Sequence, residues 1–171
     1  TERLGFYSAQ ALSEAGATVV VTSRSFERAS EAAGRLSGSV EGVALDVTSE
    51  ADVASTFQRV CEKHGGIDIL VNNASEHPEE QPLEHWDYTL RHNLTSTFLG
   101  CKHAIPALRK RGGGSIINMS SVSSLIGRDR SVYEGSSGLV PNTADYTAAK
   151  AGVIGLTMDL AAQVGKHNIR V

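Results

Sequence analysis

The chain has 171 residues, and we expect residues 1–171 to form one domain, since a typical domain has about 150 residues. Sixteen Lys and Arg residues against nineteen Asp and Glu residues give a net charge of −3, which argues against a nucleic-acid partner. No run approaches the roughly 18 apolar residues of a membrane span. Cys61 and Cys101 stand far apart without a partner motif, which argues against a disulfide scaffold or a metal site. Composition therefore predicts a cytoplasmic globular protein that binds neither nucleic acid nor membrane.

The two ends of the sequence fall inside predicted elements. Residues 1–17 predict a helix with Gly5 near its start and Gly16 at its end. Residues 167–171 resemble the opening of a strand. Because a domain seldom begins on a helix and ends inside a strand, we expect the sequence to be an internal part of a longer protein.

Between the ends, short apolar strands alternate with helices. Runs rich in β-branched and aliphatic residues predict strands at 18–22, 40–47, 67–71 and 115–119. Helical periodicity, with Ser25 as the N-cap of the first of these helices, predicts helices at 25–36, 50–63, 86–111 and 147–164. This alternation predicts an α/β fold, a doubly wound parallel sheet with helices on both faces. Ligands of such sheets bind at the carboxyl ends of the strands.

The first predicted strand ends in Ser23 and Arg24, without an acidic residue beside them. At this position of a dinucleotide-binding fold an acid would bind the ribose 2′-hydroxyl, and an arginine would accommodate a 2′-phosphate. We therefore expect NADP(H) to be preferred over NAD(H). The alternative is that Arg24 is a solvated residue at a helix entry.

Polar residues also follow the next two strands. Asp46 and Val47 close the second strand, and Asn73 and Ala74 follow the third. Such residues can be turn formers alone. Their position at neighbouring strand ends favours a ligand crevice.

Tyr146 and Lys150 are four residues apart on a predicted helix, so they share one helical face. A nearby ammonium favours the phenolate, which suits a tyrosine for acid–base chemistry. The pair is common by chance, but Ser121 follows the preceding strand and Asn93 lies in the long helix before it.

Together these motifs resemble the short-chain dehydrogenase/reductase family in its simple one-domain, Rossmann-like form. Residues 72–74 resemble the family's Asn-Asn-Ala-Gly motif, with Ser75 in place of the glycine. Residues 45–48 resemble its adenine-contacting segment, and residues 92–94 the segment with the catalytic Asn. Residues 116–121 resemble the strand that leads to the catalytic Ser, and Tyr146 with Lys150 match the Tyr-x-x-x-Lys pair.

The resemblance implies hydride transfer between a nicotinamide cofactor and a small carbonyl or secondary alcohol. Tyr146 would exchange a proton with the substrate oxygen, Ser121 would orient that oxygen, and Lys150 would support the phenolate and hold the nicotinamide ribose. Asn93 would fix a water molecule. The cofactor-binding residues that the sequence predicts are Gly5, Ser23, Arg24, Asp46, Val47, Asn73, Ala74, Tyr146 and Lys150.

The sequence also departs from the family pattern. The family's first strand, which is central in its sheet, and most of its glycine-rich turn have no counterpart, and Arg3 stands at a glycine position. Ser121 and Tyr146 are 25 positions apart, about twice the usual spacing, so residues 127–142 contain an insertion. Long loops are often functional. The polar residues of this one favour a small polar, sugar-like substrate, unless they only solvate the loop: Arg128, Arg130, Tyr133, Glu134 and Asn142.

Other functions stay open. Tyr133 is the second candidate for the acid, although no lysine follows it four positions on. A nucleotide-binding protein without catalysis and a relative that modifies nucleotide sugars are alternatives to the oxidoreductase. Small residues on the last helix allow close helix packing, and the resemblance implies a homodimer or homotetramer through that helix: Ala148, Ala151, Gly152 and Gly155.

Overall fold

A computed structural model describes residues 4–76, 85–126, 129, 131 and 143–171. Its contacts divide the chain into two compact units, Thr1–Gln58 and Arg59–Val171, and each is described by itself. The expectation of a single domain over residues 1–171 stays a prediction. No helix of the described chain combines the length and the apolar composition that a membrane span requires.

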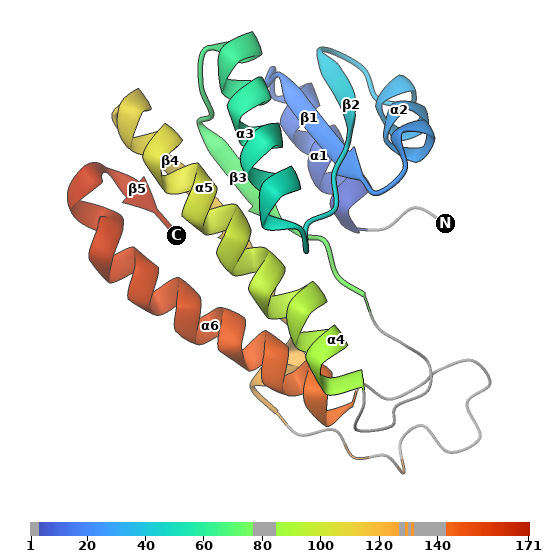
Figure 1. The fold of residues 1–171 in the computed structure, drawn as a ribbon, viewed down its shortest axis with the longest axis vertical. Coiled ribbons are helices and arrows are strands. Elements are labelled where there is room, and N and C mark those ends of the chain that lie inside the picture. Colours follow the sequence, from blue (N-terminus) through green and yellow to red (C-terminus); the bar gives the residue numbers. More distant parts are fainter. Residues whose placement is uncertain (1–3, 77–84, 127–128, 130, 132–142) are drawn as a thin grey trace. The chain divides into compact units, whose positions relative to one another are not determined.

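The first unit pairs two parallel strands, β1 (Val19–Ser23) and β2 (Val40–Ala44), as Figure 1 shows. Its helices are α1 (Leu4–Glu14), α2 (Phe26–Gly34) and the first part of α3 (Glu50–His64). Ser25 caps α2 as predicted, because its hydroxyl accepts the Arg28 N–H at 3.3 Å. α2 lies very close to β2, since a Cβ atom at Gly42 would come within 2.5 Å of the Ala29 backbone.

The second strand is shorter than the prediction of residues 40–47. β2 ends at Ala44, and Leu45 N donates one more hydrogen bond to Ser23 O at 2.8 Å. Asp46 then forms a turn with its own carboxylate, which accepts bonds from Thr48 N at 2.8 Å and Thr48 Oγ1 at 2.7 Å. A side chain that bonds its own backbone two residues on competes with the strand and ends it.

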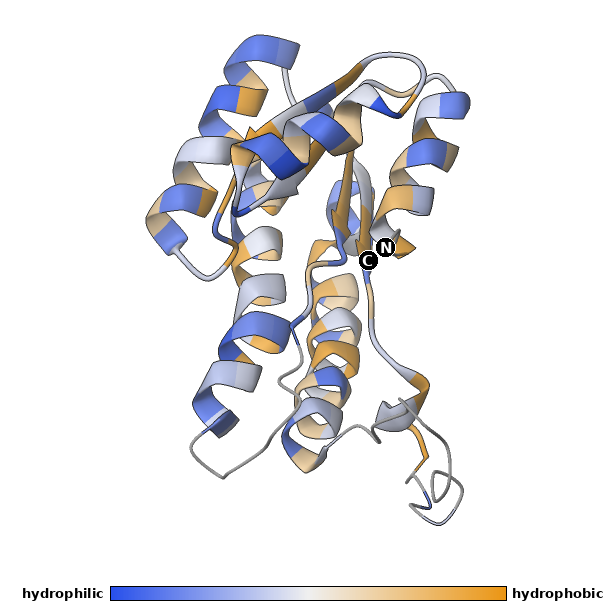
Figure 2. Cartoon of the chain, turned by 90° about the vertical axis from the view of Figure 1, so that its right-hand side faces the viewer, coloured by the Kyte–Doolittle hydropathy of each residue, from blue (hydrophilic) through white to orange (hydrophobic). Residues whose placement is uncertain are grey.

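The second unit contains the parallel strands β3 (Ile69–Asn72), β4 (Gly114–Asn118) and β5 (Ile169–Arg170), in that order across the sheet. The helices α5 (Ser96–Arg111) and α6 (Ala144–Val164) lie side by side on it (Figure 1). Figure 2 shows hydrophobic and hydrophilic residues on different sides of the helices. The core is made of fully buried aliphatic side chains, among them Leu108, Ile116, Val153 and Ile169.

The helix predicted over residues 86–111 is interrupted. α4 (Trp86–Leu90) continues into a π-helical turn, η2 (Arg91–Thr95), before α5 begins. The Ser96 N–H donates to Arg91 O, five residues back, so the turn holds one extra residue. The local periodicity of the sequence does not reveal such a turn. The π-helical turn contains Asn93.

Two further boundaries differ from the prediction, and both concern the site. α6 begins at Ala144 and not at residue 147, so Tyr146 lies in its first turn. β4 ends at Asn118, and Ser121 is the N-cap of a short 3-10 turn, η3 (Val122–Ser124). Tyr146 thus lies inside α6, close to its start, and Ser121 lies at the start of a turn.

Candidate active site

Side chains of β3 and β4 are joined to α6 by half-buried polar contacts, which we call the amide ladder: Asn72, Asn118 and Thr157. Asn72 Nδ2 donates to Asn118 Oδ1 at 2.8 Å, and Asn118 Nδ2 donates to Thr157 Oγ1 at 3.0 Å. α5 can pass this close to Asn72 because Gly100 has no side chain. A Cβ atom at this position would overlap Asn72 Oδ1. The ladder fixes the carboxyl ends of both strands, and Met119 N donates to Asn72 O at 3.0 Å beyond them.

The sequence analysis did not single out Asn118 or Thr157. Asn118 carries a signal in hindsight, because it is a polar residue that closes an apolar strand. Its partner in the parallel pairing is Asn72, which is also an amide. Thr157 carries no such signal, since a threonine within a long helix is ordinary.

Lys150 is the buried cation of this unit, with only 3% of its surface exposed. Its Nζ donates to Met119 O at 2.9 Å, and the Ser120 hydroxyl donates to Lys150 O at 2.8 Å. These two bonds attach α6 to the segment that follows β4. Burial lowers the pKa of Lys150.

Tyr146 lies one helical turn before Lys150, as the spacing predicts. Lys150 Nζ is 5.7 Å from the centroid of the Tyr146 ring. The ammonium has three donors, of which Met119 O takes one. A cation thus lies beside the phenol ring at the carboxyl end of a parallel strand.

The two serines after β4 have different partners. Ser120 Oγ contacts Lys150 O and Ser124 Oγ, so it belongs to the attachment of α6. Ser121 Oγ contacts only its own turn within the described chain, accepting from Ser123 N at 3.3 Å and sharing a 2.8 Å bond with Ser123 Oγ. Ser121 is therefore the serine that can turn to a ligand without releasing α6.

Asn93 is completely buried in the π turn, and its carboxamide has three hydrogen-bond partners within the protein. Its Oδ1 accepts from Ser75 Oγ at 2.6 Å. Its Nδ2 donates to Glu76 O at 2.8 Å and to Thr89 O at 2.9 Å. The carboxamide therefore holds the segment after β3. The role predicted for Asn93 in fixing a water molecule stays a prediction.

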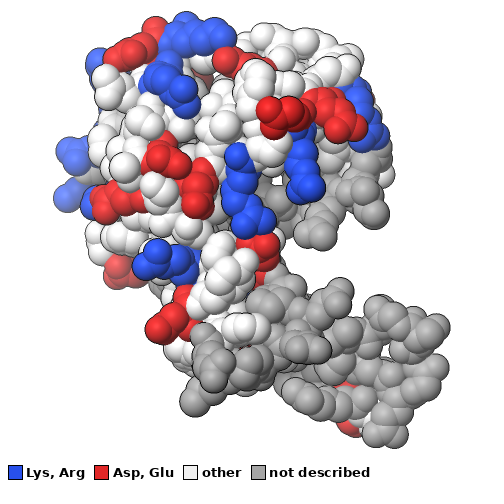
Figure 3. Space-filling view, turned by 45° about the vertical axis from the view of Figure 1, so that its right-hand side comes forward, with Lys and Arg blue, Asp and Glu red and all other residues white. Residues whose placement is uncertain are grey.

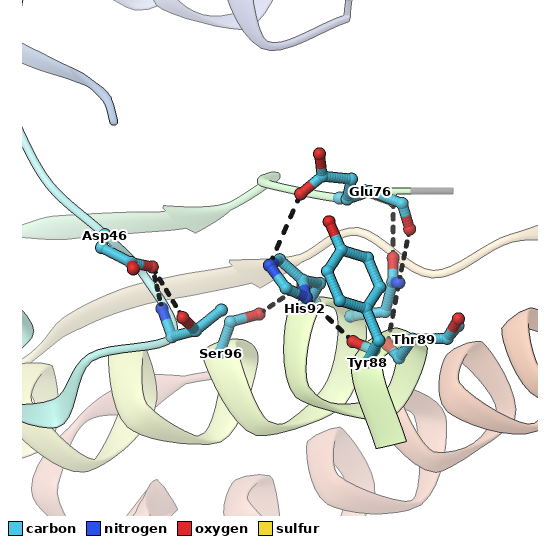
Figure 4. Close-up of polar contacts among 9 residues, drawn as sticks. Asp46, Glu76, Tyr88, Thr89, His92 and Ser96 are labelled. Atoms are coloured by element: carbon cyan, nitrogen blue, oxygen red, sulfur yellow. Dashed lines mark hydrogen bonds and ion pairs between the residues drawn. The ribbon is translucent and has the colours of Figure 1, made fainter. Parts of the chain in front are cut away.

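Two neighbouring side chains hold the same segment. Ser75, at the position where the family motif has glycine, supplies the hydroxyl that Asn93 accepts. His92 Nδ1 lies 2.9 Å from Tyr88 O and its Nε2 lies 3.4 Å from Glu76 Oε2, as Figure 4 shows. Because a carbonyl only accepts, Nδ1 is the donor in the first contact. His92 thus has structural partners on both ring nitrogens.

Apart from Gly5, the predicted nucleotide-binding residues of the first unit lie at the carboxyl ends of β1 and β2. Ser23 ends β1, and Arg24 follows it with its side chain exposed. The bond from Leu45 N to Ser23 O brings the turn of Asp46 and Val47 beside this end. Glu27, the nearest carboxylate in sequence, accepts a 2.5 Å bond from Ser25 Oγ, which lowers its pKa.

The predicted site residues fall into two sets. Gly5, in the first turn of α1, belongs to the first unit together with Ser23, Arg24, Asp46 and Val47. The second unit holds Asn73, Ala74, Asn93, Ser121, Tyr146 and Lys150. Other predicted residues lie outside the described part of the chain: Arg3, Arg128, Arg130, Tyr133, Glu134 and Asn142. The described residues gather no group of three His, Cys, Asp or Glu side chains able to hold a metal ion.

The surface next to Ser121 is apolar. Val122, Leu125 and Ile126 are all exposed, Leu125 to 74%. On the face in Figure 3, acidic and basic side chains alternate without an extended basic area over the described residues.

Parallel strands joined through helices, with polar side chains at their carboxyl ends, define a nucleotide-binding α/β fold of the Rossmann type. A sequence profile described as short chain dehydrogenase matches residues 2–171. The chain belongs to the short-chain dehydrogenase family, as the motifs predicted.

Individual relatives agree with this assignment. The chain is 34% identical over 179 residues to "Dehydrogenase/reductase SDR family member 4" of Rattus norvegicus, covering 100% of this chain and 60% of that protein. It is 33% identical over 180 residues to "D-beta-hydroxybutyrate dehydrogenase" of Rhizobium meliloti, covering 100% of this chain and 65% of that protein. A crystal structure of a short chain dehydrogenase from Mycobacterium smegmatis superposes with a TM-score of 0.86 at 29% identity, covering 100% of this chain and 70% of that one. The chain thus spans between three fifths and two thirds of the length of these two relatives.

Proposed function

We propose that the full-length protein is an oxidoreductase that interconverts a carbonyl and a secondary alcohol with a nicotinamide cofactor. The observation that carries the proposal is the placement of Tyr146 and Lys150. The buried Lys150 ammonium is fixed by Met119 O and lies beside the Tyr146 ring, in the unit that also holds Ser121. A structural lysine needs no phenol beside it, whereas an acid–base tyrosine gains from the cation.

In this mechanism the cofactor, when bound, supplies or accepts the hydride. During reduction the Ser121 hydroxyl donates a hydrogen bond to the carbonyl oxygen and orients it. The Tyr146 phenol gives its proton to the same oxygen, which becomes the alcohol. Lys150 stabilises the phenolate that remains, and Asn93 holds the segment after β3 in place. Oxidation runs the same proton transfer in reverse.

The proposed cofactor is NADP(H), in preference to NAD(H). Arg24 is exposed at the carboxyl end of β1, where a guanidinium can pair with two oxygens of a 2′-phosphate. The one carboxylate nearby in sequence, Glu27, is bonded to Ser25. The residues proposed to hold the rest of the cofactor are Gly5, Ser23, Asp46, Val47, Asn73, Ala74, Tyr146 and Lys150.

Two observations bear on the substrate. The exposed apolar side chains after Ser121 favour a substrate with an apolar portion close to its carbonyl: Val122, Leu125 and Ile126. The charged sequence of residues 128–134 favours instead a small polar, sugar-like substrate. A panel that contains both kinds of carbonyl decides between these candidates.

We further propose a homodimer or homotetramer in the cytoplasm. Phe98 on α5 and Met158 on α6 are exposed large apolar residues, and the small residues Ala151 and Gly155 of α6 are exposed as well. Such a surface suits close packing of helices between copies. Both cysteines are free thiols, which suits a reducing compartment. Burial raises the pKa of Cys101 to about 11, so this thiol is unreactive at neutral pH.

The test is NADPH absorbance with a panel of carbonyls, using the full-length protein. Tyr146→Phe should abolish turnover and leave the Kd for NADPH largely unchanged, because the phenol is one of several proposed cofactor contacts, whereas its proton is needed where charge develops on the substrate. Tyr7→Phe, an exposed tyrosine of α1, is the matched control. Turnover of Tyr146→Phe close to the wild-type value would reject Tyr146 as the acid. Tight NADPH binding without turnover by the wild type would support a nucleotide-binding protein without catalysis. Turnover of nucleotide sugars alone would support a relative that modifies nucleotide sugars.

A further inference from the structure

Asn73 and Ala74, two residues of the proposed cofactor site, follow an anchored position of the chain. Asn72 closes β3, and its Nδ2 donates to Asn118 Oδ1 at 2.8 Å. Asn72 O also accepts the Met119 N–H at 3.0 Å, so Asn72 is held by its side chain and by its backbone. Asn73 is half-buried and Ala74 is exposed. These two residues thus leave the sheet from a fixed point.

A second anchor follows Ala74 directly. The Ser75 hydroxyl donates to Asn93 Oδ1 at 2.6 Å. Asn93 Nδ2 donates to Glu76 O at 2.8 Å and to Thr89 O at 2.9 Å (Figure 4). Because backbone carbonyls only accept, the nitrogen of the carboxamide must face these two partners, and its oxygen must face Ser75. Ser75 is therefore the donor to a carboxamide whose orientation is already set by two other bonds.

Asn93 suits the role of an anchor because it is held on its backbone as well. It is completely buried in the π turn that connects α4 to α5. The Thr97 hydroxyl donates to Asn93 O at 3.1 Å, and the Ser96 hydroxyl donates to His92 O at 2.8 Å. Both hydroxyls belong to buried residues four positions further along the chain. The point to which Ser75 is bonded is thus fixed before any ligand binds.

We propose that Ser75 is a positioning residue for the cofactor, which acts through Asn93 to hold Asn73 and Ala74 in the conformation that binds the nucleotide. The inference rests on the proposed function, since that function assigns the cofactor to these two residues. Glycine, which the family motif has at position 75, offers no hydroxyl, so the bond is a feature of this sequence. A segment that is ordered before binding loses less conformational entropy when the ligand arrives.

The first test measures the Kd for NADPH of the full-length protein and its variants at Ser75. Ser75→Ala should raise the Kd by about five- to tenfold, because binding must then order the segment. Ser75→Thr keeps the hydroxyl and should stay within about twofold of the wild type. Threonine fits this position, because Ser75 is exposed and Asn168 is the one non-glycine residue of the described chain with a positive φ.

The control for these measurements is Ser55→Ala. Ser55 is exposed on α3 and donates to the Asp52 carbonyl of its own helix at 3.1 Å, so its removal should leave the Kd for NADPH unchanged. A lower urea midpoint of Ser75→Ala with an unchanged Kd would overturn the proposal, since a serine with a purely structural role gives that result. Equal losses of affinity in Ser75→Ala and Ser75→Thr would overturn it as well.

A second test separates a role through Asn93 from a direct contact between Ser75 and the cofactor. In Asn93→Leu the partner of the Ser75 hydroxyl is absent, so the addition of Ser75→Ala should raise the Kd for NADPH no further. A full additional loss in the double variant would show that Ser75 binds the nucleotide itself, which contradicts the positioning role.

Urea unfolding without NADPH tests the contact independently of the cofactor. Ser75→Ala should lower the urea midpoint of the wild type and leave that of Asn93→Leu unchanged. Equal shifts in the two backgrounds would refute the bond between Ser75 and Asn93. If the wild type binds no NADPH, the proposed function fails, and these midpoints still decide whether Ser75 holds the segment. If Asn93→Leu does not fold, the comparison of Ser75→Ala with Ser75→Thr decides in both assays.

Discussion

Asn118 has three hydrogen-bond partners on different elements, Asn72, Thr157 and, in a weak bond at 3.6 Å, the Cys101 thiol, so its removal measures how strongly the amide ladder holds the second unit. Asn118→Ala removes the acceptor of Asn72 Nδ2 at 2.8 Å and the donor to Thr157 Oγ1 at 3.0 Å. A buried hydrogen bond contributes about 1 kcal/mol net, and two of them give about 2 kcal/mol. Each partner keeps a second contact, Asn72 Nδ2 with Thr97 O at 3.4 Å and Thr157 Oγ1 with Val153 O at 2.8 Å. Because these contacts leave neither partner wholly unsatisfied, we expect a total of about 2 kcal/mol and not the larger cost of orphaned groups.

The assay is urea unfolding of Asn118→Ala, Thr157→Val and the double variant. Thr157→Val removes one of the same two bonds and should cost about 1 kcal/mol of unfolding free energy. Since that bond is lost in either single variant, the double variant should be less destabilised than their sum by about 1 kcal/mol. Strictly additive costs would show that the 3.0 Å contact contributes nothing, and an Asn118→Ala cost below about 0.5 kcal/mol would refute the ladder as a stabilising feature.

Two further predictions concern the nucleotide and pH. Arg24→Ala should weaken NADPH binding by about ten- to a hundredfold and leave NADH binding nearly unchanged, because only NADPH carries the phosphate that the guanidinium would bind. Equal losses in calorimetric titrations with the two cofactors would remove the basis for the NADP(H) preference. Asp145 is buried in the first turn of α6, and although burial raises its pKa, nearby hydrogen-bond donors, among them the backbone N–H groups of Tyr146 and Asp145, leave the pKa below its ordinary value. Its contribution to stability is therefore present above about pH 3.9, the unfolded value, and is lost as pH falls through the folded value. Unfolding free energies measured across this acidic range should therefore fall less steeply for Asp145→Asn than for the wild type, and identical slopes would contradict the assignment of a charged Asp145.

Local patterns were sufficient for the class of fold and for most element positions. β-branched runs flanked by glycine and polar residues predicted β1, β3 and β4 to within a few residues, since strand preference and turn chemistry act over short distances. The helical period alone placed Tyr146 and Lys150 on one face. The α/β class and the family follow from patterns of this kind.

The boundaries and partners that matter for the site required tertiary structure. The π turn around Asn93 and the start of α6 at Ala144 are not visible in periodicity, because contacts with other segments select them. The bonds of Asn72 with Asn118 and of Asn118 with Thr157 join residues 46 and 39 positions apart, and Lys150 meets Met119 across 31 positions. Local sequence patterns extend over far fewer residues than these separations, so they cannot predict which two residues form such a bond. The sequence therefore determined which chemical groups the protein carries, and only the folded chain decided that Lys150 is buried against a backbone carbonyl and that Asn118 joins β3 to α6.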